Sequence, residues 1–243
     1  MFTLFIFSSC QHNNKNISDQ DFNIYNQDFA PVHLQFNLFA RDLYFKLNAT
    51  QINYQMFTTA LKGYLALKEN KTLKRDSILT LIDFTAPASQ KRLFIIDVKN
   101  KHLLLETYVA HGQNSGLLYA TDFSNAHGSN KSSIGFYIAS EIYSGSNGLS
   151  LKLDGQEYVN NNARARGVVI HGASYVNEQM IKYSGRIGRS FGCPAVPDYL
   201  NERVIKLLQN KSCLFIYYPN AAYLKNSELV NANPAITNFQ TIS

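Results

Sequence analysis

The sequence has few charged residues, few cysteines and no tryptophan. Charged residues make up 16% of the 243 positions, well below the roughly 25% that is usual for soluble domains, and uncharged polar residues, above all asparagine, take their place. Three cysteines are too few for a disulfide-rich scaffold, and an odd number leaves at least one without a partner in the chain. The net charge of +6 is too small and too evenly spread to predict a nucleic-acid partner.

Apolar and aromatic residues are plentiful, at 45% and 13% of the chain. Such a composition excludes disorder of the chain as a whole. The length is sufficient for one large domain or two small ones with a sizeable core.

The first ten residues, MFTLFIFSSC, form a short apolar run that ends in two serines and Cys10. The run is far shorter than the ~20 residues that a membrane-spanning helix needs, and it is typical of the hydrophobic part of a secretory signal. Its end resembles the lipobox of bacterial lipoproteins. This resemblance implies cleavage before Cys10, a lipid on its thiol, and a periplasmic or envelope-anchored location after export across the inner membrane. No Lys or Arg precedes the run and Phe7 is unusual there, so a frayed apolar N-terminus with an incidental cysteine is the alternative.

Two segments lack any hydrophobic period. Residues 11–35 are polar and rich in asparagine, a composition that buries too little to offset the entropy of ordering, so we expect a tether. Residues 225–243 predict a flexible tail for the same reason.

Residues 36–87 predict a small helical segment. Its clearest helix runs from Ile52 to Leu65, where apolar residues follow a helical stripe, with Asn48 or Thr50 as N-cap. Weaker helices are expected at 38–47 and 74–81.

Residues 88–224 predict a mainly β domain with one late helix. The expected strands form a hairpin at 93–98 and 103–109, followed by strands at 135–140, 149–153, 167–170 and 213–218. The helix lies between the last two strands, with Asp198 near its start and Val204, Leu207 and Leu208 on its apolar face.

His171 and Cys193 are the first candidates for a nucleophile with a nitrogen base. His171 follows the predicted strand 167–170, a usual place for functional side chains on a rigid support. Cys193 lies in the loop GRSFGCPAVP, where Gly192 allows a sharp turn that directs backbone N–H groups to one point, as in an oxyanion hole. Taken singly, a cysteine is more often a small core residue and a histidine at a strand end more often structural. Together they predict covalent cysteine chemistry.

The same loop carries Arg186 and Arg189. Their positive charge favours a thiolate over a thiol. With Arg164 and Arg166 they are also candidates for binding carboxylates, because a guanidinium offers a planar bidentate fork. The alternative is plain surface charge.

These features resemble the L,D-transpeptidases of the YkuD type, cysteine enzymes that remodel bacterial peptidoglycan. The resemblance rests on His171-Gly172 after a strand and on Ser190-x-Gly192-Cys193, preceded in order by the hairpin 93–109 and the element KSSIGFY at 131–137. It covers roughly 88–220, leaves the helices of 36–85 outside, and implies a β-sandwich or barrel-like catalytic domain.

The chain departs from the usual Ser-His-Gly-Cys signature of that family. Phe191 occupies the place of the second histidine, Pro194 follows the cysteine, and the gap between His171 and Ser190 is longer than usual. The chain therefore resembles a divergent Ser-x-Gly-Cys-Pro branch.

The resemblance implies attack by Cys193 on a diamino acid–D-Ala bond of a peptidoglycan stem peptide, with His171 as base, to form a thioester that passes to an amine. It implies an oxyanion hole from the N–H groups of Phe191, Gly192 and Cys193, a positioning role for Ser190, and no cofactor. The expected substrate-binding residues are Arg186, Arg189, Arg166, Phe191 and Gly172.

Other functions remain open. The acyl group can pass to water, giving an L,D-carboxypeptidase, or the fold can serve a non-catalytic, cell-wall binding lipoprotein, which the presence of Phe191 favours. A papain-type peptidase is disfavoured because its cysteine precedes its histidine. The expected partners are stem peptides and, through the lipid on Cys10, a membrane; we expect a monomer and no nucleic acid.

A metal site and a disulfide are also conceivable. Zinc needs three or four ligands, and His111, His127, His171 and Cys193 include no close pair of the usual spacing, so we predict no metal. Cys213 begins an apolar strand and is expected in the core. A disulfide between Cys193 and Cys213 would remove the nucleophile.

Overall fold

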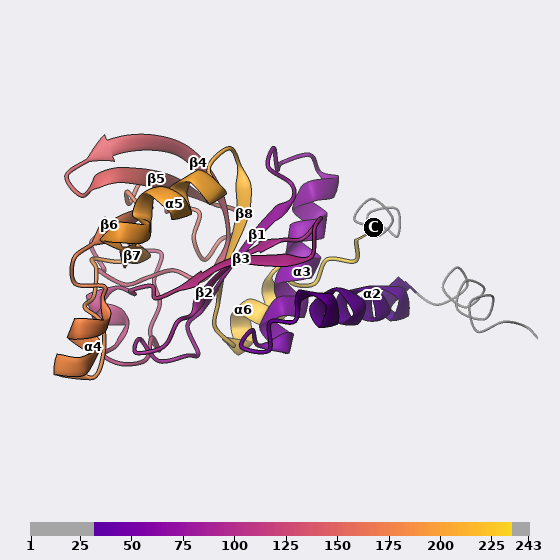
Figure 1. Cartoon of the computed structure of the whole chain (residues 1–243). Helices are drawn as coiled ribbons and strands as arrows, with labels where there is room; N and C mark the ends of the chain where they lie inside the picture. The colour runs from indigo at the N-terminus through magenta and orange to yellow at the C-terminus, as the bar shows by residue number, and fades with distance from the viewer. Residues whose placement is uncertain (1–31, 235–243) are drawn as a thin grey trace, which may run out of the picture.

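The computed structural model describes residues 32–234 of the chain. Two helices, α2 (Val32–Leu47) and α3 (Tyr54–Glu69), come first (Figure 1). They are followed by β1 (Ile78–Asp83), β2 (Leu93–Asp97), β3 (His102–Thr107), the short 3-10 helix η1 (Gln113–Ser115), β4 (Gly135–Gly145) and β5 (Gly148–Gly155). The last part contains β6 (Val169–Ala173), α4 (Glu178–Ser184), β7 (Ala195–Pro197), α5 (Asp198–Leu208), β8 (Ser212–Tyr217) and α6 (Ala221–Asn226).

The eight strands within residues 32–234 belong to one sheet in the order β3-β2-β1-β8-β4-β5-β6-β7. Neighbouring strands are antiparallel except for the pairs β1–β8 and β6–β7. Beyond β3, Ala110 forms an antiparallel bridge with Ala195 of β7, so the two edges of the sheet approach each other and the sheet nearly closes. The domain is mainly β and barrel-like, as expected.

The predicted strands correspond to β2, β3, β4, β5, β6 and β8, and the predicted late helix is α5, which begins at Asp198. Two further short helices, α4 and α6, lie in the β domain. They have seven and six residues, too few to produce a recognisable apolar stripe.

The expected helix at 74–81 is wrong, because Ile78–Asp83 is the strand β1. All six residues of β1 are buried, since the strand lies inside the sheet between β2 and β8. A strand buried on both faces has a continuous apolar run, which periodicity alone does not distinguish from part of a buried helix. The sheet therefore begins at Ile78, before residue 88.

Helix α3 confirms the expected amphipathic helix and packs on the sheet. Its N-cap is Asn53 rather than Asn48 or Thr50, because the Asn53 side chain accepts a hydrogen bond from the Met56 N–H. Its buried face joins the main core. Helix α2 extends the weaker predicted helix back to Val32, so the last four residues of the expected tether are helical.

The expected flexible tail, residues 225–243, is wrong for residues 225–234, the first two of which belong to α6. Ser227 donates a hydrogen bond to Glu157, and Val230 is buried. A short polar segment with one apolar contact gives no periodic signal, and its partner lies in a distant part of the sequence. Residues 235–243, the signal, Cys10 and most of the tether lie outside the described residues.

Within residues 32–234, none of the helices combines the length and apolarity required to cross a bilayer.

Candidate active site

The site is built on the parallel pair β6 and β7. His171 lies in the middle of β6, not after it as the sequence suggested, and it faces Ala195 in the register. Cys193 lies in the turn two residues before Ala195, so His171 is on β6 and Cys193 is in the segment that leads into the neighbouring strand β7. The two candidates thus lie on adjoining segments, but Cys193 Sγ bonds to the Gly167 carbonyl oxygen and His171 Nδ1 to that of Gly172, so their pairing in catalysis stays a prediction.

The His171 side chain is 5% exposed, and its Nδ1 lies 2.8 Å from the carbonyl oxygen of Gly172. A carbonyl oxygen can only accept, so Nδ1 carries the proton and Nε2 has a lone pair. In its neutral form the imidazole is therefore the tautomer that can accept a proton through Nε2.

The Cys193 thiol is half-buried and donates to the Gly167 carbonyl oxygen at 3.6 Å. Burial raises the pKa of this thiol, while the Val169 N–H and the Arg166 guanidinium act in the opposite direction and lower it. Tyr175 is a further neighbour: burial and the negative charge of a Cys193 thiolate raise its pKa to about 12.

The turn before Cys193 is stabilised by the hydroxyl group of Ser190. Ser190 Oγ donates to the Cys193 carbonyl oxygen at 2.6 Å and accepts from the Gly192 N–H at 3.0 Å. Ser190 therefore shapes the turn, and the Gly192 N–H that was expected in the oxyanion hole is already engaged. Gly192 has a φ of +124°, and a Cβ atom there would lie 2.8 Å from the Lys131 carbonyl oxygen. Only glycine fits this close approach without strain.

Ser132 connects this turn to the loop that precedes β4. Its Oγ donates to the Gly192 carbonyl oxygen and accepts from the Gly112 N–H, both at 3.0 Å. Sequence reasoning did not single out this serine, although it belongs to the element KSSIGFY.

Arg166 holds the same loop. It donates to the carbonyl oxygens of Ser124 at 2.8 Å and Lys131 at 2.7 Å, and to the hydroxyl groups of Ser129 and Ser133. Its guanidinium thus stabilises the loop beside Gly192 while remaining close enough to Cys193 to lower the pKa of the thiol.

The other predicted arginines differ in their contacts. Arg189 donates to the carbonyl oxygens of Gln113 at 2.7 Å and Gly116 at 3.0 Å. Arg186 bonds only to the carbonyl oxygen of the adjoining Ile187. Arg164 lies away from the Cys193 loop, in an exposed network with Glu141 and Asp154 of the β4–β5 hairpin.

Phe191 and Gly172 are placed very differently. The Phe191 side chain is 74% exposed beside the cysteine. Gly172 faces helix α5, where a Cβ atom would lie 2.7 Å from Asp198 Oδ1 and 3.0 Å from Asn201 Cβ. The glycine after His171 therefore allows α5 to pack against β6, and its expected substrate contact stays a prediction.

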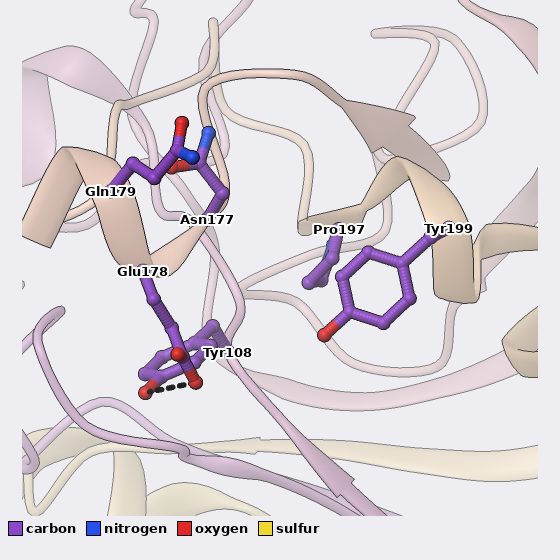
Figure 2. A pocket seen from close by; sticks show the side chains of 6 residues that line it. All are labelled: Tyr108, Asn177, Glu178, Gln179, Pro197 and Tyr199. Atoms are coloured by element: carbon purple, nitrogen blue, oxygen red, sulfur yellow. Dashed lines mark hydrogen bonds between the residues drawn. The ribbon is translucent and has the colours of Figure 1, made fainter.

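A pocket of about 350 Å³ opens at the far end of β7 (Figure 2). It is lined by Tyr108, Asn177, Glu178, Gln179, Pro197 and Tyr199. The Tyr108 hydroxyl lies 3.5 Å from Glu178 Oε1, and Figure 2 shows the Tyr199 ring on the other side of the opening, beside Pro197.

Cys193 and Cys213 are both free thiols, so they do not form the disulfide that would remove the nucleophile. Cys213 is fully buried in β8, as expected for a core residue. In the described part of the chain, no group of three or more His, Cys, Asp or Glu side chains could hold a metal ion.

Comparison with known proteins gives one family match. A family model for the L,D-transpeptidase catalytic domain matches residues 48–217. The match therefore includes α3 and β1, which the sequence resemblance had left outside. No curated protein matches the chain.

Solved structures of three bacterial L,D-transpeptidases are similar over 58% of this chain. The enzyme from Mycobacterium smegmatis has 10% identity and a TM-score of 0.37 over 59% of its chain. L,D-transpeptidase 1 of Mycobacterium tuberculosis has 10% identity and a TM-score of 0.33 over 62% of its chain. The protein from Xylanimonas cellulosilytica has 14% identity and a TM-score of 0.30 over 60% of its chain. The present chain thus spans less than two thirds of each of these solved chains.

Proposed function

Because the chain belongs to the L,D-transpeptidase catalytic-domain family, we propose that it is a peptidoglycan-modifying cysteine acyltransferase with Cys193 as nucleophile. The observation that carries this proposal is the glycine turn with Cys193, which leads into β7 next to the strand of His171. The Nδ1 bond of His171 to Gly172 leaves Nε2 as proton acceptor.

In the first step, Cys193 Sγ attacks the carbonyl carbon of a diamino acid–D-Ala bond, and its proton passes to Nε2 of His171. The C–N bond then breaks, and the departing D-Ala amine takes this proton from His171. In the second step an amine attacks the thioester, loses a proton to His171 and displaces the thiolate, which is reprotonated. Atoms and charge balance in both steps without a cofactor.

The raised pKa of Cys193 decides how the thiol is activated. A thiol with a raised pKa is protonated at neutral pH, so its proton must leave as the sulfur attacks. This favours general-base catalysis by His171 over a permanent thiolate–imidazolium pair.

The oxyanion that forms on the substrate needs donors from the same turn. Since the Gly192 N–H is engaged by Ser190, the remaining candidates are the N–H groups of Phe191 and Cys193. One donor of this kind typically lowers the barrier by ~3 kcal/mol.

The surroundings suggest how a stem peptide is held. Arg186 is the best candidate for a stem carboxylate, because its guanidinium bonds only to the carbonyl oxygen of the adjoining Ile187, whereas Arg166 and Arg189 bond to carbonyl oxygens of distant segments within the described residues. The pocket at the end of β7 combines the Glu178 carboxylate with tyrosine rings, a combination that suits the ammonium group of an amine acceptor.

Two parts of the proposal concern the whole protein. We propose that Cys10 carries a lipid and that the protein acts as a monomer at the cell envelope. Hydrolysis of the same bond, or cell-wall binding without turnover, are the competing functions, and exposed Phe191 in place of a histidine favours the second.

The test uses the purified protein with tetrapeptide stems, with and without an acceptor stem, and follows D-Ala release, acyl-enzyme mass and products by mass spectrometry. We expect release and a thioester mass that Cys193→Ala abolishes and that the matched control Cys213→Ala retains. Identical behaviour of wild type and Cys193→Ala would contradict the catalytic proposal. Cross-linked products identify the transferase, and products without cross-links identify the carboxypeptidase.

A further inference from the structure

Arg92 is a fully buried arginine without a carboxylate bound to its guanidinium. Its Nε and Nη2 donate to the Val109 carbonyl oxygen, and its Nη1 donates to the Ala86 carbonyl oxygen, at 2.9 to 3.1 Å. The guanidinium carbon lies 4.9 Å from the centre of the Phe84 ring. Burial lowers the pKa of Arg92 to about 9, although the charge of Asp83 opposes this shift. Such a buried cation is costly unless each of its donors has a partner.

The remaining partner of Arg92 is His111, which is also fully buried. Arg92 Nη2 lies 2.8 Å from His111 Nδ1, and His111 Nε2 lies 3.2 Å from the Gly116 carbonyl oxygen. A guanidinium can only donate and a carbonyl oxygen can only accept, so Nδ1 is the acceptor and Nε2 carries the proton. Burial and the Arg92 charge lower the pKa of His111 to about 4, in agreement with a neutral ring. Both ring nitrogens are engaged, so neither is available to ligate a metal or to accept a proton in this arrangement.

The backbone around His111 forms hydrogen bonds with the segment that contains Cys193. The His111 carbonyl oxygen accepts from the Ser190 N–H at 3.0 Å, and the Gln113 N–H donates to the Ser190 carbonyl oxygen at 2.7 Å. On the other side of the cysteine, the Ala110 N–H donates to the Ala195 carbonyl oxygen at 2.8 Å. Residues 110–113 thus bind the chain both before and after Cys193.

The network closes through Arg189. The carbonyl oxygen of Gly116, which accepts from His111 Nε2, also accepts from Arg189 Nη1 at 3.0 Å. The His111 ring therefore contacts both Arg92 and the Gly116 carbonyl oxygen, and Gly116 in turn binds Arg189, the residue before Ser190.

We propose that His111, fixed by Arg92 and Gly116, is a positioning residue that sets the place of the Ser190–Cys193 turn relative to His171. It acts through the backbone of residues 110–113 and does not touch the substrate. The proposal rests on the proposed cysteine chemistry only for its effect on turnover; its effect on the thiol itself is independent of the substrate.

The test compares His111→Phe, which removes both ring bonds, with His111→Asn, which retains an acceptor for Arg92. The exposed His102 supplies the matched control His102→Gln. Three quantities are measured: thermal unfolding, the pH profile of Cys193 alkylation by iodoacetamide with the site mapped by mass, and kcat and KM with tetrapeptide stems.

For His111→Phe we expect kcat to fall by about 100-fold with little change in KM, because misplacement of a reacting group by about 1 Å has an effect of this size. We also expect the midpoint of the alkylation profile to move to lower pH. Burial is the largest cause of the raised pKa of Cys193, so a loosened turn returns the thiol toward its ordinary value. The titratable and charged groups around the sulfur, Arg166, Tyr175 and the proposed base His171, are unchanged in this variant. His111→Asn should lie between His111→Phe and the wild type, and His102→Gln should match the wild type.

A lower alkylation midpoint of Cys193 together with a lower kcat is the result expected when the turn loses its position. A lower unfolding temperature with an unchanged alkylation midpoint and unchanged kcat would overturn the proposal and leave His111 a purely structural residue. If His111→Phe does not fold, the same comparison is made with His111→Asn. If the wild type itself releases no D-Ala, the proposed function fails, but the alkylation midpoint still tests the positioning role.

Discussion

Gly192 shows at the scale of one residue how the site is shaped. Its φ of +124° is unfavourable for any residue with a Cβ atom, and that atom would also meet the Lys131 carbonyl oxygen at 2.8 Å. We expect Gly192→Ala to lower the free energy of unfolding by about 1–3 kcal/mol, the usual cost of a strained backbone position, and to reduce acyl-enzyme formation. Urea denaturation and the rate of acylation measure the two effects.

Gly128 provides the control for this prediction. It also has a positive φ, +67°, but a Cβ atom there meets no atom within 4 Å. Gly128→Ala should therefore show only the intrinsic cost of the left-handed conformation, about 1 kcal/mol, with normal acylation. Equal losses of stability and activity in the two variants would mean that the approach of Lys131 is not what requires a glycine at position 192.

Sequence reasoning found the residues with local signals and missed those whose partners are distant. His171 and Cys193 lie in distinctive short motifs, and the structure places them on adjoining segments, one on β6 and the other just before β7. The contacts of Arg166 with Ser124 and Lys131 depend on how a loop folds back, and no residue spacing contains that information. For this reason all four arginines looked equally available, whereas only Arg186 lacks a bond to a distant segment or carboxylate.

At the scale of elements, helix α3 and the sheet approach each other at Gly63. A Cβ atom at this position would lie 2.2 Å from Phe136 Cζ in β4. In an exposed helix, alanine is more favourable than glycine by roughly 1 kcal/mol. Here we expect the opposite sign, a loss of about 1–3 kcal/mol from overpacking, measured by urea denaturation of Gly63→Ala.

Thr58 of the same helix gives the comparison. It is half-buried, so Thr58→Ala should gain a few tenths of a kcal/mol from helix propensity. If Gly63→Ala stabilises the protein as Thr58→Ala does, the Phe136 ring can move aside and α3 is not closely packed on the sheet.

The same packing explains which elements could be predicted. Helix α3 has one apolar face, which a period of 3.6 residues reveals, whereas β1 is buried on both faces and has no period. The identity of β1 as a strand depends on its parallel partner β8, which lies more than a hundred residues later in the sequence. Length and β-branched content were the only local cues, and they were too weak in a six-residue run.

At the scale of the whole molecule, Glu157 connects helix α6 and the residue after it to the sheet. Its carboxylate accepts from the Phe136 N–H and the Tyr223 hydroxyl, both at 2.8 Å, and from Ser227 Oγ. Burial raises the pKa of Glu157, although these three donors act against the shift. A carboxyl group whose pKa is higher in the folded state takes up a proton there first. Its ionisation therefore lowers the stability at neutral pH, and acidification relieves this penalty.

The variant Glu157→Gln removes the negative charge but can keep the hydrogen bonds of the side chain. The amide oxygen can accept from Phe136 and Tyr223, and the NH₂ group can donate to Ser227, so the geometry allows all three bonds to persist. We expect the unfolding temperature of the wild type to rise relative to that of the variant as the pH falls from 7 through the raised pKa toward the ordinary glutamate value of about 4.3. Thermal unfolding at several pH values measures this difference. A constant difference between the two proteins over this range would mean that Glu157 titrates normally, and that the C-terminal segment is attached without a buried charge.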